Sequence, residues 1–251
     1  MSAYSALAEA GYRAYTRDKT TLFFTFAFPL LFLVVFGLIF HGQDVEESGR
    51  PYIAYIAPGV LSWGVGNAAV FGVGFVLMQW RRDDILRVIR MTPTPLASVL
   101  GSRYVLAVGI GLVQAVLFVA VALLPVMGLE LAAGWPLAIP VLVLGITAFL
   151  ALGAIVGSYA RTPEAVAAVA NFLMVPMAFL SGSFYPLDAM PSWMQAMSWV
   201  LPLRHLNDGV SAALTDAGGG ADIAVACGGL VAFAVVFGAV AFRVFRWSDR
   251  T

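Results

Sequence analysis

Charged residues are scarce in this sequence. They make up only 11% of its 251 residues, whereas 61% are hydrophobic and the mean hydropathy is +0.90. Soluble domains carry about 25% charged residues. A soluble domain of this size would leave much apolar surface in water and would aggregate. The composition therefore excludes a soluble protein and predicts an integral membrane protein.

Residues that build enzyme or metal sites are also few. The single cysteine, Cys227, cannot form an intrachain disulfide, and the two histidines, His41 and His205, lie far apart in the chain. The sequence has no HExxH or CxxC pattern for a metal, and no nucleophile–base pair. We expect no catalytic residues and no metal site, so the chain by itself is not an enzyme. Its net charge of zero gives no basic field for nucleic acid.

Only one lysine is present, Lys19, and the residues directly before it are Arg17 and Asp18. A phosphate-binding loop needs the pattern G-x-x-x-x-G-K-[ST], because backbone amides and the lysine hold the phosphates. The chain is therefore not a P-loop ATPase.

Six apolar stretches are long enough to cross a bilayer, which takes about 20 residues in a helix. We predict an all-α membrane protein that forms a single transmembrane domain over residues 1–251. None of the stretches has a carboxylate near its middle, which disfavours a proton- or sodium-coupled carrier. Gly153 and Gly157 form a GxxxG pair that fits either packing within one chain or a dimer interface. The stretches are 21–40, 52–79, 96–124, 136–160, 163–182 and 222–242.

The distribution of arginine and lysine predicts the orientation. If the N-terminus is cytoplasmic, only Arg50 and Arg204 lie outside. This strong positive-inside bias places both termini in the cytoplasm. The residues inside or at inner helix ends are then Arg13, Arg17, Lys19, Arg81, Arg82, Arg87, Arg90, Arg103, Arg161, Arg243, Arg246 and Arg250.

Residues 1–20 predict a cytoplasmic amphipathic helix that lies along the inner membrane surface, either as an anchor or as a docking element. Glu9 and Arg13 form an i,i+4 pair on this helix. Its less polar face consists of Tyr4, Leu7, Gly11 and Tyr15.

The loop at residues 80–95 is the most charged part of the chain. Pro93 and Pro95 end the short helix that we expect there. Charges of both signs beside an apolar strip favour a docking surface over residues that only set the topology. The charged residues are Arg81, Arg82, Asp83, Asp84, Arg87 and Arg90, and the apolar strip is Ile85, Leu86, Val88 and Ile89.

Residues 183–221 contain two short apolar pieces, 192–201 and 203–214, each too short to cross the membrane. Aromatic residues such as Phe184, Tyr185 and Trp193 fit the outer interface of a bilayer. We predict an external re-entrant hairpin of two half-helices.

The order of these elements resembles the type-2 ABC exporter permeases. The closest local match is the run from Phe179 to Pro186, read as FLSGSFYP, followed by MPSW at 190–193 and LPLRH at 201–205. Together with MTP at 91–93 and RTPE at 161–164, this run is similar to the bacterial drug-export subgroup, and the resemblance covers essentially the whole chain.

The resemblance implies a bacterial plasma (inner) membrane complex of two permeases, expected to be a homodimer, and two separate P-loop ATPase subunits. ATP and magnesium would bind to the ATPase partner, and this chain would hold no cofactor. Residues 80–95 would form the coupling helix. The contacts with the ATPase would come from Arg81, Arg82, Asp83, Asp84, Arg87 and Arg90, with a smaller contact at Arg161 and Glu164.

The resemblance also implies a path for a small-molecule cargo between the two permeases, lined mainly by the second and fifth spans. From helix position alone, we expect Asn67, Phe71, Asn171, Met174 and Phe179 near this path. The outer hairpin would act as an external lid that includes Phe184, Tyr185 and Trp193. Walls without fixed charge suit an amphipathic or lipophilic cargo, and a drug, a lipid and a polysaccharide all remain open.

Two other functions fit the same sequence. One is a stand-alone channel or secondary carrier without an ATPase, which the lack of charge inside the spans disfavours. The other is a membrane scaffold protein, in which the charged loop at 80–95 would dock an enzyme complex.

Overall fold

The computed structural model describes residues 3–45, 50–91, 96–187, 189–215 and 217–245. Within this part of the chain, six helices are long and apolar enough to cross a membrane. They match the six predicted stretches, so the all-α, six-span prediction is confirmed. The helices are Lys19–Ile39, Tyr52–Arg82, Gly101–Ala122, Trp135–Tyr159, Pro163–Leu180 and Gly220–Val244.

The first span is assembled from three pieces. It contains α2 (Lys19–Leu22), the π-helical turn η1 (Phe23–Ala27) and α3 (Phe28–Ile39). Pro29, at the start of α3, has no N–H to donate to the carbonyl four residues before it. A π-helical turn next to such a proline lets the helix continue through the break.

The remaining elements follow in chain order. The two-residue strands β1 and β2 pair antiparallel, with Asp44 opposite Pro51 and Val45 opposite Arg50. The helices are α1 (Ala3–Arg17), α4 (Tyr52–Arg82), α5 (Ile85–Arg90), α6 (Leu96–Ala122), the 3₁₀ turn η2 (Trp135–Leu137), α7 (Ala138–Tyr159), α8 (Pro163–Leu180), α9 (Ser192–Ser198), α10 (Pro202–Thr215) and α11 (Gly220–Val244).

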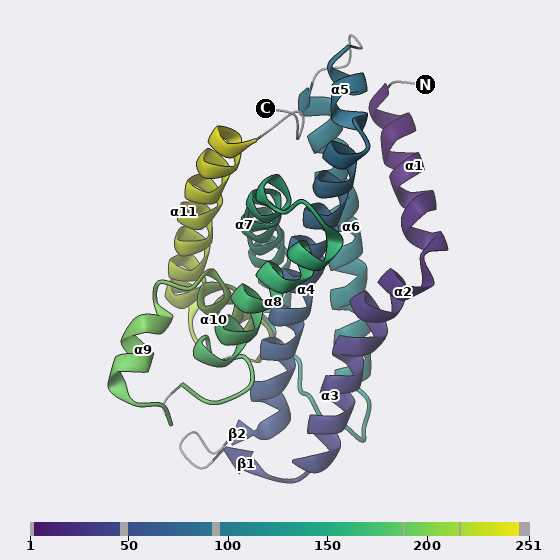
Figure 1. Cartoon of the computed structure of the whole chain (residues 1–251). Coiled ribbons are helices and arrows are strands. Elements are labelled where there is room, and N and C mark those ends of the chain that lie inside the picture. Colours follow the sequence, from purple (N-terminus) through teal and green to yellow (C-terminus); the bar gives the residue numbers. More distant parts are fainter. Residues whose placement is uncertain (1–2, 46–49, 92–95, 188, 216, 246–251) are drawn as a thin grey trace.

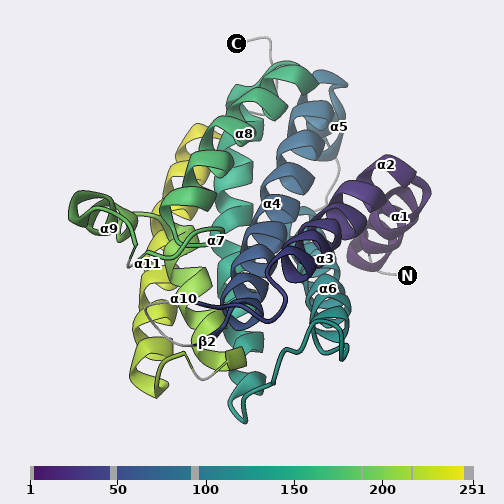
Figure 2. The same ribbon diagram turned by 90° about the horizontal axis from the view of Figure 1, so that it is seen from below.

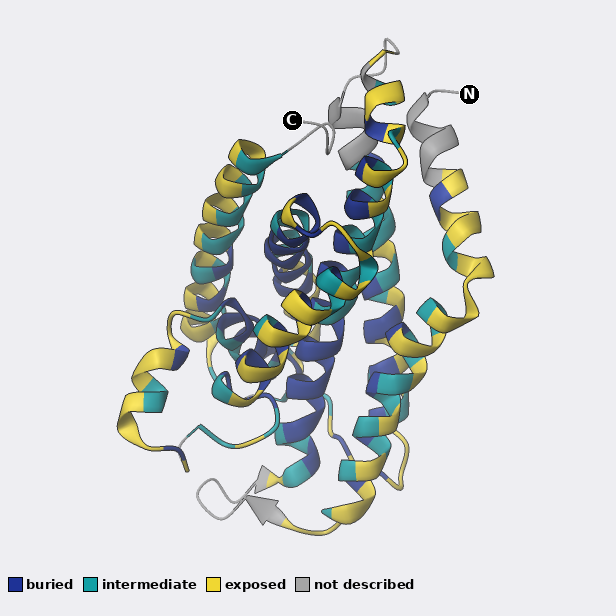
Figure 3. Ribbon diagram, in the orientation of Figure 1, coloured by how far each residue is buried: buried dark blue, intermediate teal, exposed yellow. Residues whose placement is uncertain are grey.

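Helices α4 and α7 form the centre of the bundle, and both are buried along most of their length (Figure 3). Glycines let their backbones touch. A Cβ atom at Gly153 would lie 2.5 Å from the carbonyl oxygen of Val70, and one at Gly157 would lie 2.6 Å from that of Gly74. The GxxxG pair is therefore used for packing inside the chain.

The two ends of the bundle differ. Helix α5, the first turns of α1 and the last turns of α11 lie at one end, while β1, β2 and the loops that flank α9 lie toward the other (Figure 1). Seen from below, α9 stands out on one side and α1 with α2 on the opposite side (Figure 2). Helix α10 packs into the bundle against α4, α7 and α11.

The outer helices expose apolar side chains. Phe242 of α11 is 82% exposed and Phe172 of α8 is 78% exposed. Exposing such apolar surfaces to water would cost free energy, whereas lipid tails solvate them. The exposure pattern therefore fits a bilayer around the bundle.

Helix α1 runs alongside α6 (Figure 1) and packs against it. Gly11 is buried, and a Cβ atom there would lie 3.0 Å from a guanidinium nitrogen of Arg103. The predicted pair is present, since Arg13 donates to Glu9 at 2.5 Å. The side chains of Tyr4 and Leu7 lie outside the described part of the chain. Contact of α1 with the membrane surface stays a prediction.

Candidate functional site

The charged loop predicted at 80–95 is divided by a sharp turn. Helix α4 continues to Arg82, and α5 starts only at Ile85. Between them, Asp84 has a left-handed backbone (φ 55°), a conformation that short polar side chains tolerate better than alanine does. The predicted single coupling helix is therefore corrected to a helix end, a turn and the short helix α5. Residues 92–95 lie outside the described residues.

Arg81 differs most from its predicted role. Its side chain is buried (3% exposed) and donates to the backbone carbonyls of Gly157, Ser158 and Ala160, with 3.0 Å between Nη1 and the Gly157 oxygen. Carbonyls at the C-terminal end of a helix lack donors within the helix and carry partial negative charge. Arg81 thus caps α7 from α4 and does not present its guanidinium to solvent, contrary to the prediction.

The exposed surface at this end combines charge with apolar side chains. Arg82 and Asp83 form an exposed ion pair with 3.3 Å between Nε and Oδ1. Val88 is 61% exposed and Met91 is 74% exposed. Ile85 and Arg87 are exposed as well, and we call these six residues the α5 surface. Leu86 is buried and holds α5 on the bundle, and the side chain of Arg90 is outside the described part.

The link between α7 and α8 lies beside this surface. The Thr162 hydroxyl accepts from the backbone N–H of Ala165 at 3.2 Å, and Pro163 occupies the first turn of α8, as expected of a helix start. Arg161 and Glu164 are exposed. A surface hollow of about 340 Å³ lies between the start of the first span, the last turns of α4 and the start of α8. The end of α4 and the α7–α8 link therefore border the same hollow. The residues that line it are Asp18, Thr21, Phe75, Met78, Gln79, Arg82 and Pro163.

Asp18 fixes the start of the first span at this end. Its Oδ1 accepts from the backbone N–H groups of Thr20 at 3.0 Å and Thr21 at 3.1 Å. The hydroxyl of Thr21 donates to Oδ2 at 2.5 Å. These hydrogen bonds, above all that from the Thr21 hydroxyl, lower the pKa of the Asp18 carboxyl.

The five predicted pathway residues do not meet on one surface of the single chain. Asn67 and Phe71 are half-buried on α4, and Met174 is fully buried against Gly66. Asn171 and Phe179 lie exposed on α8. Asn171 and Met174 thus lie on different faces of α8, and a path lined by all five residues requires a rearrangement that exposes Met174.

Of the predicted lid residues, Phe184 packs inward. Its ring centroid lies 5.3 Å from that of Trp63, 5.6 Å from Phe179 and 5.8 Å from Phe32, so it joins α3, α4 and α8. Aromatic rings at such separations attract each other in tilted or edge-on arrangements. Tyr185 (51% exposed) and Trp193 (61% exposed) do face outward.

The loop at 181–183 is held from two helices that sequence analysis did not connect with it. Gly182 has a φ of 78°. Its carbonyl accepts from the hydroxyl of Tyr55 and, at 3.1 Å, from Nδ2 of Asn207. A Cβ atom at Gly59 would overlap the backbone of Ser183. Tyr55 is a polar side chain in the largely apolar helix α4, and this was a signal available in the sequence, whereas Asn207 lies among other polar residues of α10.

Known proteins match this chain over most of its length. Residues 2–215 match the family model described as ABC-2 type transporter. The inner membrane transport permease YadH of Escherichia coli is 24% identical over 179 residues, which cover 71% of this chain and 69% of YadH. Nodulation protein J of Sinorhizobium fredii is 30% identical over 215 residues, covering 82% of this chain and 77% of that protein.

A further relative is the linearmycin resistance permease protein LnrN of Bacillus subtilis. It is 30% identical over 114 residues, which cover 45% of this chain and 30% of LnrN. Six apolar helices, together with an inner membrane permease among the relatives, identify a multipass inner membrane protein. The resemblance seen in the sequence is confirmed, and the chain belongs to the ABC-2 type transporter family.

Proposed function

We propose that this chain is the permease of an ATP-driven exporter that moves an amphipathic or lipophilic small molecule, a drug or a lipid, out of the cell. ATP and magnesium bind to a separate ATPase subunit. The α5 surface carries this proposal, because exposed apolar residues flanked by charges of both signs suit a protein partner. The name of the relative LnrN, a resistance permease, supports a drug or a similar molecule as cargo.

In this proposal both termini and α5 face the cytoplasm, as the positive-inside bias indicates. The ATPase docks on Ile85, Val88 and Met91, with Arg82, Asp83 and Arg87 at the rim. Arg161 and Glu164, in the neighbouring link, make a smaller contact. Arg81 does not touch the ATPase; it ties the docking element to α7.

The transmission of movement follows from the contacts inside the chain. Arg81 joins the ends of α4 and α7, and these helices touch along their backbones at Gly153 and Gly157. A push on α5 therefore moves α4 and α7 together. ATP shifts the permease between two states because the ATPase binds one of them more tightly.

A second copy of the permease completes the path in this proposal. The exposed face of α8, with Asn171, Phe172 and Phe179, and the half-buried Phe71 of α4 then line or border the space between the copies. These side chains carry no charge, which suits a lipophilic cargo. The external lid is formed by Tyr185 and Trp193, and Phe184 anchors it to the bundle.

Purification of the tagged protein from its native membranes in mild detergent tests this function. We expect a P-loop ATPase in about equal amount, with Mg²⁺-dependent ATP hydrolysis. Val88→Asp places a charge in the α5 surface and is expected to reduce ATPase recovery by about tenfold or more. The matched control is Val126→Asp, since Val126 is 56% exposed in the α6–α7 link, outside the α5 surface.

Equal recovery with both variants would contradict docking on α5. A well-folded, abundant protein without any ATPase would instead favour the stand-alone channel or the scaffold protein.

A further inference from the structure

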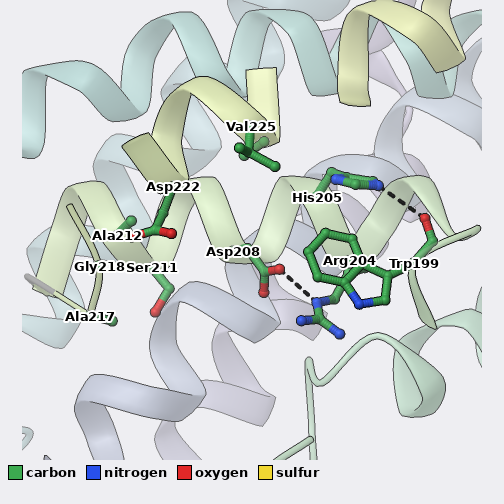
Figure 4. A pocket seen from close by; sticks show the side chains of 11 residues that line it. Trp199, Arg204, His205, Asp208, Ser211, Ala212, Ala217, Gly218, Asp222 and Val225 are labelled. Carbon is green, nitrogen blue, oxygen red and sulfur yellow. Dashed lines mark hydrogen bonds and ion pairs between the residues drawn. The ribbon is translucent and has the colours of Figure 1, made fainter. Parts of the chain in front are cut away.

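A cavity of about 330 Å³ opens beside α10 and the first turns of α11 (Figure 4). Helix α10 lies away from α5 (Figure 1). The side chain of Trp199 forms one wall, and Ala212, Val225 and Ala226 form apolar parts of the lining. The polar lining consists of Arg204, His205, Asp208, Ser211 and Asp222. Neither the proposed docking surface nor the proposed pathway uses these residues.

Arg204 is already engaged within the chain. Its Nε donates to Oδ2 of Asp208 at 2.6 Å, as the dashed line in Figure 4 marks, and Nη1 donates to the hydroxyl of Ser198. Its guanidinium carbon also lies 4.7 Å from the centre of the Trp199 ring. Arg204 therefore fixes Asp208 and Trp199 in place, and its positive charge is balanced by Asp208.

Asp222 supplies a second carboxylate. Its Oδ2 accepts from the backbone N–H of Gly219 at 2.7 Å, which caps the start of α11. The absence of a side chain at Gly218 leaves room for this carboxylate, because a Cβ atom there would lie 2.8 Å from the same oxygen. Asp222 is exposed, and among the described residues Arg204 is the one arginine or lysine of the cavity lining, where it pairs with Asp208.

The two carboxylates influence each other across the cavity. Burial raises the pKa of Asp208 in spite of the ion pair with Arg204, and the negative charge of Asp222 raises this pKa further. Among the described residues of the lining, the ionisable side chains are Arg204, His205 and the two aspartates. A positively charged group in the cavity would remove this repulsion.

We propose that this cavity binds an organic ammonium group, supplied by the head group of an aminophospholipid. The N–H donors of an ammonium group match the carboxylates of Asp208 and Asp222 and the hydroxyl of Ser211, and the Trp199 ring offers an aromatic wall. An anion is disfavoured because Arg204 is balanced by Asp208 and Asp222 repels it. A metal ion is disfavoured because the described residues include no group of three His, Cys, Asp or Glu side chains suited to hold one.

The position of the cavity favours a lipid over a soluble amine. Val225, at its edge, is 56% exposed and begins a row of exposed apolar residues on α11 that continues through Val235 (65% exposed) and Val236 (55% exposed). At Gly228, on the same helix, a Cβ atom would meet nothing within 4 Å. An acyl chain can follow this row while its head group occupies the cavity.

Native mass spectrometry of the purified full-length permease in detergent tests this proposal. The probes are short-chain phosphatidylethanolamine, short-chain phosphatidylglycerol and ethanolamine. Asp222→Asn removes the charge but keeps an oxygen that can accept from Gly219. We expect it to weaken phosphatidylethanolamine binding by about tenfold and not to weaken phosphatidylglycerol binding, because the charge that repels this anionic lipid is removed. Gly218→Ala, which displaces the carboxylate without changing the charge, is expected to weaken the same binding.

The matched control is Glu130→Gln, because Glu130 is an exposed carboxylate in the α6–α7 link. It should bind all probes as the wild-type protein does. Thermal unfolding of each variant shows that the fold is kept. Wild-type affinity of Asp222→Asn for phosphatidylethanolamine, or equal wild-type affinities for the two lipids, would overturn the proposal. Asp222-dependent binding of ethanolamine without lipid preference would overturn the lipid source and assign the site to a soluble amine.

Discussion

Nη1 of Arg81 donates to the carbonyl oxygen of Gly157 at 3.0 Å, which joins the last turn of α4 to the last turn of α7. The same guanidinium also donates to Ser158 and Ala160, so one side chain occupies three carbonyls at a helix end. Replacing Arg81 by methionine keeps an unbranched apolar stem but removes these bonds. We expect the variant to lose about 2–4 kcal/mol of stability, because buried carbonyls are left without donors.

Thermal unfolding in detergent measures this loss, and cargo transport by the intact complex measures its effect on coupling. Arg81→Lys should recover only part of the stability, since a single ammonium group replaces the planar fork of donors. An unfolding temperature of Arg81→Met equal to that of the wild-type protein would show that the contact with α7 does not stabilise the bundle.

The contact between α4 and α7 leads to a second prediction. In Gly157→Ala, the new Cβ would lie 2.6 Å from the carbonyl oxygen of Gly74, so the helices must separate. We expect destabilisation by about 1–3 kcal/mol. Gly72→Ala is the matched control, because a Cβ there meets nothing within 4 Å, and alanine favours a helix by about 1 kcal/mol. The midpoint temperature of thermal unfolding should fall for Gly157→Ala and rise for Gly72→Ala. A shift of both midpoints in the same direction would refute the close packing.

The turn between α4 and α5 supplies a third prediction. The double variant Asp83→Ala and Asp84→Ala is expected to uncouple transport from ATP hydrolysis while membrane insertion stays intact. Alanine at position 84 also strains the left-handed backbone by about 1–2 kcal/mol. Asp84→Asn separates the two effects, since asparagine removes the charge and tolerates this conformation. Transport and ATP hydrolysis are measured in the same vesicles, and normal coupled efflux in the double variant would argue against docking at this loop.

Asn171 leads to a prediction about the cargo. It is an uncharged polar residue on the exposed face of α8, next to Phe172, and Phe179 is exposed further along the same helix. Asn171→Leu is expected to change which cargo molecules are exported more than it changes assembly. Efflux of several lipophilic dyes and the size of the purified complex are the two measurements. If the complex instead falls apart into single permeases, Asn171 belongs to the interface between copies.

Asp18 leads to a prediction about pH. Its pKa is lower in the folded protein than the ordinary value of 3.8, chiefly because the Thr21 hydroxyl donates to its carboxylate. Its contribution to stability is therefore complete at neutral pH and is lost as the pH falls below 3.8 through the lowered pKa. Asp18→Ala is expected to cost about 1 kcal/mol at pH 7, as for other helix caps.

The measurement is thermal unfolding of wild-type and Asp18→Ala proteins from pH 7 down to the acid limit. The difference between them should shrink only below the ordinary pKa. A constant difference at all pH values would mean that charge on Asp18 does not contribute to the cap.

The spans could be predicted from the sequence because the bilayer itself imposes their length and apolar composition. Helix starts such as Thr162 and Pro163 were also predictable, since caps depend on residues three positions apart. The direction in which the Arg81 side chain points was not predictable. Its charge suggests an exposed contact, but the position of α7 beside the end of α4 decides that its guanidinium points inward.

The same division holds for the rest of the molecule. By itself, the sequence determined a six-span, all-α membrane protein with a charged loop after the second span, because hydrophobicity and charge act locally or through the surrounding solvent. Only the tertiary structure decided that Gly153 and Gly157 pack inside the chain, that Asn171 and Met174 lie on different faces of α8, and that Asp208 and Asp222 share a cavity. Those relationships depend on how helices distant in the chain pack, and no local pattern encodes that packing.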